Sequence, residues 1–169
     1  SDPDNTNLRY FLGEFLLLRG NNERALEQYQ EMIKSDPHRH DARDRMYDFL
    51  VLKRDLTGAK KLTSDLEKSD KADPGLPYFQ GRDAELDGRL EDALKLFLKS
   101  LENLPGFGPA FRRAGMLEIQ LGKNNEGIEH LNQSITINAN DVAARLALAK
   151  HYFLAKDLGQ SKEQLNRIF

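Results

Sequence analysis

Apolar residues recur every three or four positions along most of this chain, with polar residues between them. The clearest stripe lies in the first forty residues and consists of Leu12, Leu16, Ala25, Leu26, Tyr29 and Ile33. This spacing follows the turn of an α-helix, so we expect these side chains to share a buried face. The pattern predicts that the chain folds into amphipathic α-helices.

The pattern repeats at a fixed interval of 34 residues. When the sequence is aligned with itself at this interval, no insertion is needed, and equivalent positions of successive copies form four columns of similar residues. They are Gly13, Tyr47, Gly81, Gly115 and Ala149; Ala25, Ala59, Ala93, Gly127 and Ser161; Pro3, Pro37, Lys71, Pro105 and Ala139; and Gly20, Arg54, Gly88, Gly122 and Lys156. Agreement of independent columns over the whole chain indicates one structural unit in several copies.

Each column has a physical role in a pair of antiparallel helices. The first two columns hold mostly small residues, because two helices that cross closely leave no room for large side chains. Glycine in the fourth column, as in "LRGNNE", predicts the left-handed residue that ends a helix before the chain reverses. Proline in the third column predicts the end of the second helix and the start of the next unit.

A 34-residue helix–turn–helix unit with these columns resembles the tetratricopeptide repeat, and the similarity covers essentially the whole chain. The best matches are "LGEFLLLRGNNERALEQYQEMIKSDP" and "QGRDAELDGRLEDALKLFLKSLENLP". The resemblance implies an all-α, right-handed superhelical solenoid of about five repeats. They are expected near residues 6–39, 40–73, 74–107, 108–141 and 142–169. Tyr47, Arg54 and Lys71 weaken the pattern in the second repeat, and Lys156 weakens it in the fifth.

Both ends of the chain suggest a segment of a longer array. Pro3 is in phase with Pro37, so residues 1–5 are predicted to end a preceding repeat; a Ser-Asp expression scar is the alternative. At the other end, Leu165, Ile168 and Phe169 predict an uncovered apolar face, whereas arrays normally finish with a polar capping helix.

Composition narrows the possible functions. The net charge is −2, from 25 basic and 27 acidic residues, so no overall field favours nucleic acid or an anionic membrane. Because the chain has no cysteine, disulfides, thiolate zinc sites and thiol nucleophiles are excluded. No apolar run approaches the ~20 residues that span a bilayer. Neither a cytoplasmic nor a periplasmic location is favoured.

The resemblance implies a protein or peptide partner bound in a concave groove lined by the first helix of each repeat. Helical spacing predicts the groove residues Tyr10, Glu14, Asp41, Asp44, Asp48, Tyr78, Arg82, Glu85, Arg112, Met116 and Lys150. Acidic residues predominate in the N-terminal half of this set, and basic residues appear later.

Two features of the groove allow alternative interpretations. Asp41, Asp44 and Asp48 either receive a Lys or Arg of a partner or are favoured by the helix dipole and by pairing with Arg45. Tyr10 and Tyr78 either anchor a ligand or belong to the core, and Phe153 is expected in the core.

No catalytic constellation is found, and the prediction is a non-enzymatic protein without cofactor or metal. His38 and His40 flank Arg39, but this pair lacks the third and fourth ligands of a stable zinc site, so we expect a solvated loop. His130 and His151 are expected to be isolated on separate helices, without an obvious acidic partner.

The main functional hypothesis is therefore a protein–protein interaction module. The residues that clamp the carboxylate of heat-shock chaperone tails in similar arrays are missing here. The alternative is an architectural segment of a bacterial cell-envelope or polysaccharide-export assembly, such as one for exopolysaccharide secretion. Self-association through the uncapped C-terminal helix is a further possibility.

Overall fold

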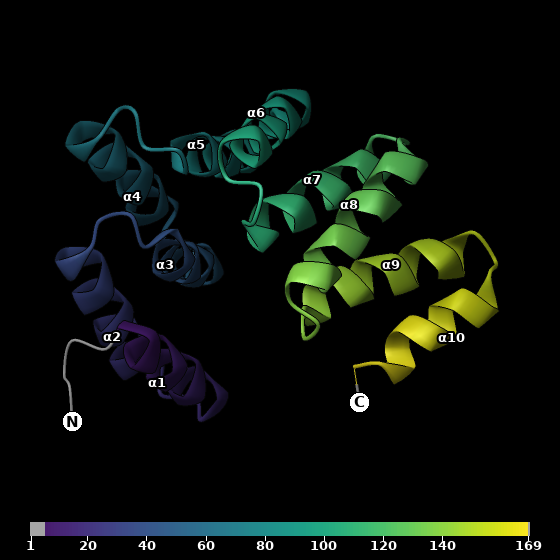
Figure 1. Ribbon diagram of the computed structural model, residues 1–169, viewed down its shortest axis with the longest axis horizontal. Coiled ribbons are helices and arrows are strands. Elements are labelled where there is room, and N and C mark those ends of the chain that lie inside the picture. Colours follow the sequence, from purple (N-terminus) through teal and green to yellow (C-terminus); the bar gives the residue numbers. More distant parts are fainter. Residues whose placement is uncertain (1–5, 169) are drawn as a thin grey trace. The chain divides into compact units, whose positions relative to one another are not determined.

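A computed structural model describes residues 6–168, and in this range the chain forms ten α-helices and no strand. Short loops join successive helices (Figure 1). The helices are α1 (Thr6–Leu18), α2 (Asn22–Ser35), α3 (His40–Leu52), α4 (Leu56–Ser69), α5 (Leu76–Leu86), α6 (Leu90–Asn103), α7 (Gly108–Gln120), α8 (Asn124–Ile137), α9 (Val142–Leu154) and α10 (Leu158–Asn166). The all-α helix–turn–helix fold predicted from the sequence is confirmed. The expected end of a preceding repeat at residues 1–5 lies outside the described residues.

The turn inside each repeat has the backbone conformation that the glycine column predicts. Gly20, Gly88 and Gly122 have φ values of 72°, 74° and 81°. Arg54 and Lys156, which replace glycine in this column, adopt the same left-handed conformation with φ values of 61° and 62°. The turn thus has the same backbone conformation at Arg54 and Lys156 as at the glycines, although a side chain there is sterically unfavourable.

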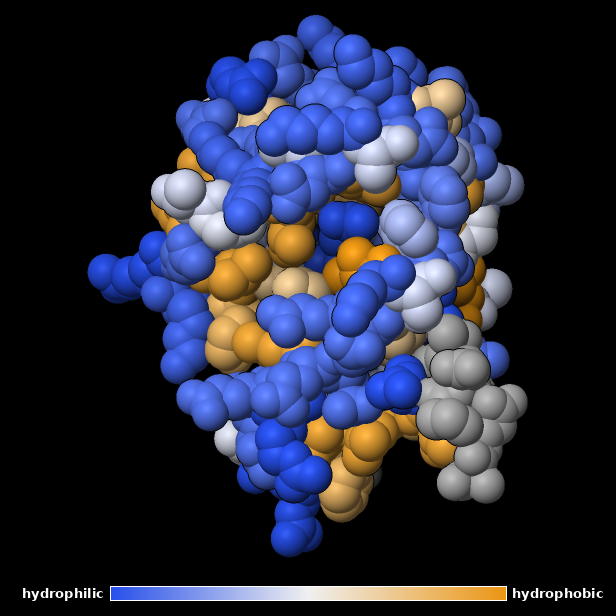
Figure 2. All heavy atoms as spheres, turned by 90° about the vertical axis from the view of Figure 1, so that its left-hand side faces the viewer, coloured by the Kyte–Doolittle hydropathy of each residue, from blue (hydrophilic) through white to orange (hydrophobic). Residues whose placement is uncertain are grey.

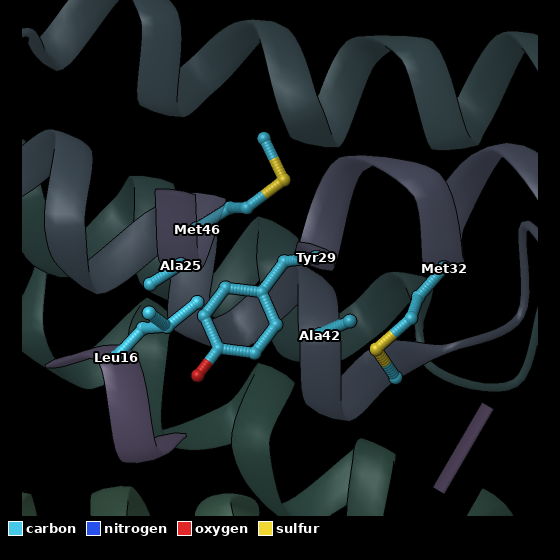
Figure 3. Packing of buried hydrophobic residues seen from close by; sticks show 6 residues of the cluster. All are labelled: Leu16, Ala25, Tyr29, Met32, Ala42 and Met46. Atoms are coloured by element: carbon cyan, nitrogen blue, oxygen red, sulfur yellow. The ribbon is translucent and has the colours of Figure 1, made fainter. Parts of the chain in front are cut away.

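The chain divides into two compact units, unit 1 (Ser1–Phe79) and unit 2 (Gln80–Phe169), so α5 begins in one and ends in the other. The core of unit 1 joins side chains of α1, α2 and α3 (Figure 3). Its buried residues are Leu16, Ala25, Tyr29, Met32, Ala42 and Met46. A Cβ on Gly13 would lie 2.7 Å from the Tyr29 ring, so the small residue is needed where these helices cross. Leu12 was expected in the same stripe but is 43% exposed, because α2 covers the side of α1 that carries Gly13 and Leu16.

Unit 2 has its own core, in which α7 and α8 cross closely. A Cβ on Gly115 would lie 2.7 Å from the carbonyl oxygen of Gly127, and a Cβ on Gly127 would lie 2.7 Å from that of Gly115. The two backbones are therefore in direct contact. Leu131, Ala144 and Leu148 form a buried cluster beside this crossing.

Several large apolar side chains remain at the surface. On α1, Leu8, Phe11 and Phe15 are more than half exposed, and Phe153 and Leu154 of α9 are likewise exposed. On the face drawn in Figure 2, apolar surface gathers in patches bordered by hydrophilic side chains. Among the described helices, none is both long and apolar enough to cross a membrane.

Candidate protein-binding surface

The predicted groove residues of α1 are tied to α3 by a hydrogen-bond network. Arg45 donates to the Glu14 carboxylate over 2.8 Å and to the Tyr10 hydroxyl over 3.3 Å. The Tyr29 hydroxyl donates to the same carboxylate over 2.6 Å. Burial, together with the hydrogen bond to Glu14, raises the pKa of Tyr29 far above its ordinary value, so this hydroxyl remains a donor. The Arg45 and Glu14 side chains are 36% and 31% exposed, so the network is both fixed and accessible.

Asp41 has a partner on its own chain segment. Arg39 donates two hydrogen bonds to its carboxylate, of 2.9 and 2.7 Å. Burial alone would raise the pKa of Asp41, but the hydrogen bonds from Arg39 and from the Ala42 N–H outweigh it and lower the pKa. Asp41 thus remains ionised and half-buried at the start of α3, and Arg45 pairs with Glu14 rather than with Asp41.

Asp44 and Tyr78 belong to the interior of unit 1. Asp44 is 3% exposed, Tyr78 is fully buried, and the Tyr78 hydroxyl donates to the Asp44 carboxylate over 2.6 Å. The two residues are 34 positions apart, so the bond connects equivalent faces of α3 and α5. Asp48, one turn further along α3, is half-buried.

In unit 2 the predicted groove residues again link consecutive first helices. Arg113 of α7 lies 3.4 Å from both carboxylate oxygens of Glu85 on α5. Arg112 donates to Asp141, which precedes α9, over 3.1 Å. Arg82 is 3% exposed and is therefore part of the interior.

Asp141 has partners on three different residues. Besides Arg112, it accepts a hydrogen bond from the Ser134 hydroxyl over 2.7 Å and one from the Ala144 N–H over 3.1 Å, which caps α9. Burial alone would raise the pKa of Asp141, but the charge of Arg112 and these hydrogen bonds lower it.

Other predicted residues are open to solvent. Met116 is 40% exposed on α7, and Lys150 is exposed on α9. Phe153 is 62% exposed, so the expectation that it belongs to the core is wrong. It lies near the end of α9, where Leu154 is also exposed. Unit 2 therefore presents apolar and basic side chains on its first helices.

Two partnerships were missed because they cross between helices. Arg45 lies 31 residues after Glu14, and Arg113 lies 28 residues after Glu85. Each interval is somewhat shorter than the 34-residue repeat, so each pair joins nearby turns of two successive first helices. A search for opposite charges at such intervals would have found both. His130 was expected to lack an acidic partner, but its Nδ1 lies 2.6 Å from a Glu118 carboxylate oxygen on the preceding helix.

The expectation for His38 and His40 also changes. Asp73, which lies 35 and 33 residues later, places one carboxylate oxygen within hydrogen-bond distance of each imidazole. The pair thus has the third potential ligand that the sequence-based interpretation lacked. Within the described residues this is the one group of at least three His, Asp or Glu side chains arranged closely enough to hold a metal ion.

Comparisons with known proteins agree with this architecture. Residues 1–40 match the tetratricopeptide repeat family model. A search of curated proteins finds no significant match. Among solved structures, the chain is similar to TTC0263, a thermophilic TPR protein of Thermus thermophilus, with a TM-score of 0.69 and 18% identity over 96% of this chain and 89% of that one.

Two further structures are similar in fold. The type IV pilus biogenesis factor PilW gives a TM-score of 0.62 and 17% identity, over 98% of this chain and 76% of that one. A chain of the APC/C hetero-tetramer Cut9–Hcn1 gives a TM-score of 0.68 and 17% identity, over 99% of this chain and 34% of that one. The first 40 residues match the family in sequence, and the described helices have the family's fold.

Proposed function

We propose that the chain is a non-enzymatic module that binds a peptide or a partner domain along the faces of its first helices. The observation that carries this proposal is the network of Tyr10, Glu14 and Arg45, whose charged groups are half-exposed but held in place by hydrogen bonds between α1 and α3. A partner that meets such a surface does not have to order these side chains, so less of the interaction energy is lost on binding.

The two units offer different chemistry to a partner. In unit 1, the accessible acids Glu14, Asp41 and Asp48 lie on α1 and α3 with Arg45 among them, which suits a segment with basic and hydrogen-bonding side chains. In unit 2, the exposed Met116 supplies a flexible apolar contact of the kind that adapts to different partners. Asp44, Tyr78 and Arg82 support these surfaces from the interior instead of contacting a partner.

A peptide array tests the proposal. Fifteen-residue peptides of varied charge and apolar content are probed with the 169-residue chain, with Asp48→Lys and with Met116→Glu. The matched control is Lys95→Glu, which reverses a 78% exposed charge on α6, a second helix. We expect Asp48→Lys to weaken binding of basic peptides about tenfold and Met116→Glu to weaken binding of apolar ones, with Lys95→Glu unchanged. Equal binding by all four proteins would contradict the proposal.

An architectural role is the second candidate, and exposed apolar residues on α10 favour it. Leu158 is 63% exposed and Leu165 is 39% exposed, which leaves this short helix with an apolar face toward solvent. We propose that in this case the helix packs against a second copy of the chain. Sedimentation velocity over a range of concentrations should then show a dimer that Leu158→Asp abolishes. A monomer at every concentration would exclude self-association through α10. An architectural role in a cell-envelope assembly would then require a different contact surface on this chain.

A further inference from the structure

His38, His40 and Asp73 meet where two inter-helix connections of unit 1 approach each other. The two histidines lie in and directly after the α2–α3 connection, and Asp73 lies in the α4–α5 connection. His38 Nδ1 is 2.6 Å from one carboxylate oxygen of Asp73, and His40 Nε2 is 2.8 Å from the other. The three possible ligand atoms all lie within 4.8 Å of one another.

The surroundings hold these side chains in position. The Asp73 side chain is fully buried, and the Gly75 N–H donates to its Oδ1 over 2.7 Å. The His40 side chain is 11% exposed and its ring lies beside Phe79, with centroids 6.3 Å apart. A Cβ on Gly75 would lie 2.5 Å from the His40 ring, so the absence of a side chain there gives the imidazole its place. His38 is 53% exposed and leaves the group open to solvent from one side.

The local charge favours a cation. Asp73, Asp36 and Asp70 all act electrostatically on His38. The positive charges nearby are Arg43, on which Asp73 acts, and Arg39, on which Asp36 acts. Burial alone would raise the pKa of Asp73, but the hydrogen bond from His38, the charge of His40 and the other hydrogen bonds lower it, so the carboxylate is ionised at neutral pH.

We propose that His38 Nδ1, His40 Nε2 and an Asp73 carboxylate oxygen form a binding site for a divalent transition-metal ion, with Zn²⁺ as the best match. Two imidazoles and one carboxylate are ligands that Zn²⁺ accepts, whereas Mg²⁺ and Ca²⁺ require oxygen ligands. Three protein ligands leave one coordination position for water or for an atom of a partner.

The ion takes the place of the protons that now lie between the imidazoles and the carboxylate. Ligand atoms around a tetrahedral Zn²⁺ are about 3.3 Å apart, given zinc–ligand bonds of about 2.0–2.1 Å. The imidazole nitrogen that now contacts the coordinating Asp73 oxygen must therefore move away from it by roughly half an ångström or slightly more, and the other imidazole nitrogen must reach a similar distance from the same oxygen. His38 can supply much of this change because it is half-exposed. The bound ion would then connect the α2–α3 and α4–α5 connections in place of two hydrogen bonds.

Isothermal titration calorimetry of the 169-residue chain with ZnCl₂ tests the site. The variants are His38→Gln and Asp73→Asn, and the matched control is His151→Gln, which removes a half-exposed histidine of unit 2. We expect one Zn²⁺ per chain, at least tenfold weaker binding in both site variants, binding within twofold in the control, and no binding of Mg²⁺. Circular dichroism checks that each variant keeps its helices.

The site is overturned if Zn²⁺ does not bind, if the control loses as much affinity as the site variants, or if Asp73→Asn binds as tightly as the unchanged chain. The last result would mean that the two histidines alone capture the ion from solution. If Asp73→Asn loses its helices, the site is tested instead with His38→Gln, by comparing the visible spectrum of Co²⁺ bound to this variant with that of Co²⁺ bound to the unchanged chain. An intense four-coordinate spectrum that His38→Gln abolishes supports the site, and the weak spectrum of six-coordinate Co²⁺ contradicts it.

Discussion

Asp73 in unit 1 and Asp141 in unit 2 occupy the same column of the repeat, two intervals of 34 residues apart. Both are buried, with 2% and 5% exposure, and both lie just before a first helix. Asp141 accepts a hydrogen bond from the Ala144 N–H in α9, and Asp73 accepts one from the Gly75 N–H directly before α5. Their other partners differ completely. Asp73 is paired with two histidines, whereas Asp141 is paired with a guanidinium and a hydroxyl.

The positions that correspond to the two histidines show why the sites diverge. Relative to Asp141, they are Gly106 and Gly108, which have no side chain to offer. Arg112, from the second turn of α7, and Ser134, from α8, take their place. The same column holds Arg39 and Phe107 in two other repeats, so the buried carboxylate is a feature of these two repeats alone. Residues outside the repeat consensus decide whether a guanidinium or a pair of imidazoles pairs with it.

Removing each carboxylate gives the largest expected effect. Asp141→Ala removes a charged partner of the largely buried Arg112 guanidinium and the cap of α9, so we expect a loss of about 3 kcal/mol in the free energy of unfolding. Asp73→Ala should cost less, about 1–2 kcal/mol, because it removes hydrogen bonds to two imidazoles and not the charged partner of a guanidinium. Urea denaturation followed by circular dichroism measures both.

Asp157→Ala is the matched control, since Asp157 caps α10 through the Gln160 N–H but is exposed and has no buried partner. Its loss should be about 1 kcal/mol, the value of a cap alone. If Asp141→Ala costs no more than Asp157→Ala, the buried ion pair contributes nothing beyond capping and the contrast between the two carboxylates disappears.

The two units also differ in how their close helix crossings would respond to a methyl group. Gly115→Ala brings a Cβ against the backbone of α8, which cannot move aside, so we expect a loss of about 2–3 kcal/mol. Gly13→Ala meets the ring of Tyr29 instead, and a side chain can shift, so about 1 kcal/mol is expected. Thermal unfolding measures the loss of stability in each variant. Equal losses would show that the Tyr29 ring cannot shift to accommodate the added methyl group.

The dependence of stability on pH sharpens the comparison further. The pKa of Asp141 is lowered in the folded chain, so its charge stabilises the fold fully above the ordinary carboxyl pKa of about 3.9. This contribution is lost as the pH falls through the lower folded-state pKa. The groups that face the carboxylate are Arg112, the Ser134 hydroxyl and the Ala144 N–H.

We therefore expect the difference in unfolding free energy between the unchanged chain and Asp141→Asn to shrink between pH 7 and pH 2.5. Urea titrations at several pH values measure it, and the use of a difference removes the contribution of other carboxylates. A difference that stays constant over this range would mean that the charge of Asp141 does not stabilise unit 2.

The sequence predicted the helices and turns well because these depend on local spacing. The positive φ values at the glycine column and the small residues at the crossings follow from the same columns. The sequence predicted the residues of the binding face less well. Asp44 was placed among the groove residues, with contact to a partner as one of two interpretations, yet it is buried and accepts a hydrogen bond from Tyr78, one repeat away. The Asp73 cluster was missed for the same reason, since its members are distant along the chain and no local spacing connects them.

Glycine at the two unusual turns should give the smallest effect. Arg54 in unit 1 and Lys156 in unit 2 have left-handed backbones that cost a side chain roughly 1–2 kcal/mol, and glycine relieves this cost but adds conformational entropy to the unfolded chain. We expect Arg54→Gly and Lys156→Gly each to stabilise the fold by about 0.5 kcal/mol, and the two effects to add because the sites lie in different units.

Ala155→Gly is the matched control, because this neighbouring residue has a φ of −75° and glycine should there destabilise the fold by about 0.5–1 kcal/mol. Thermal unfolding of the three variants decides the matter: if Arg54→Gly and Lys156→Gly lose stability as Ala155→Gly does, the left-handed turn carries no strain in either unit and the side chains themselves must stabilise it.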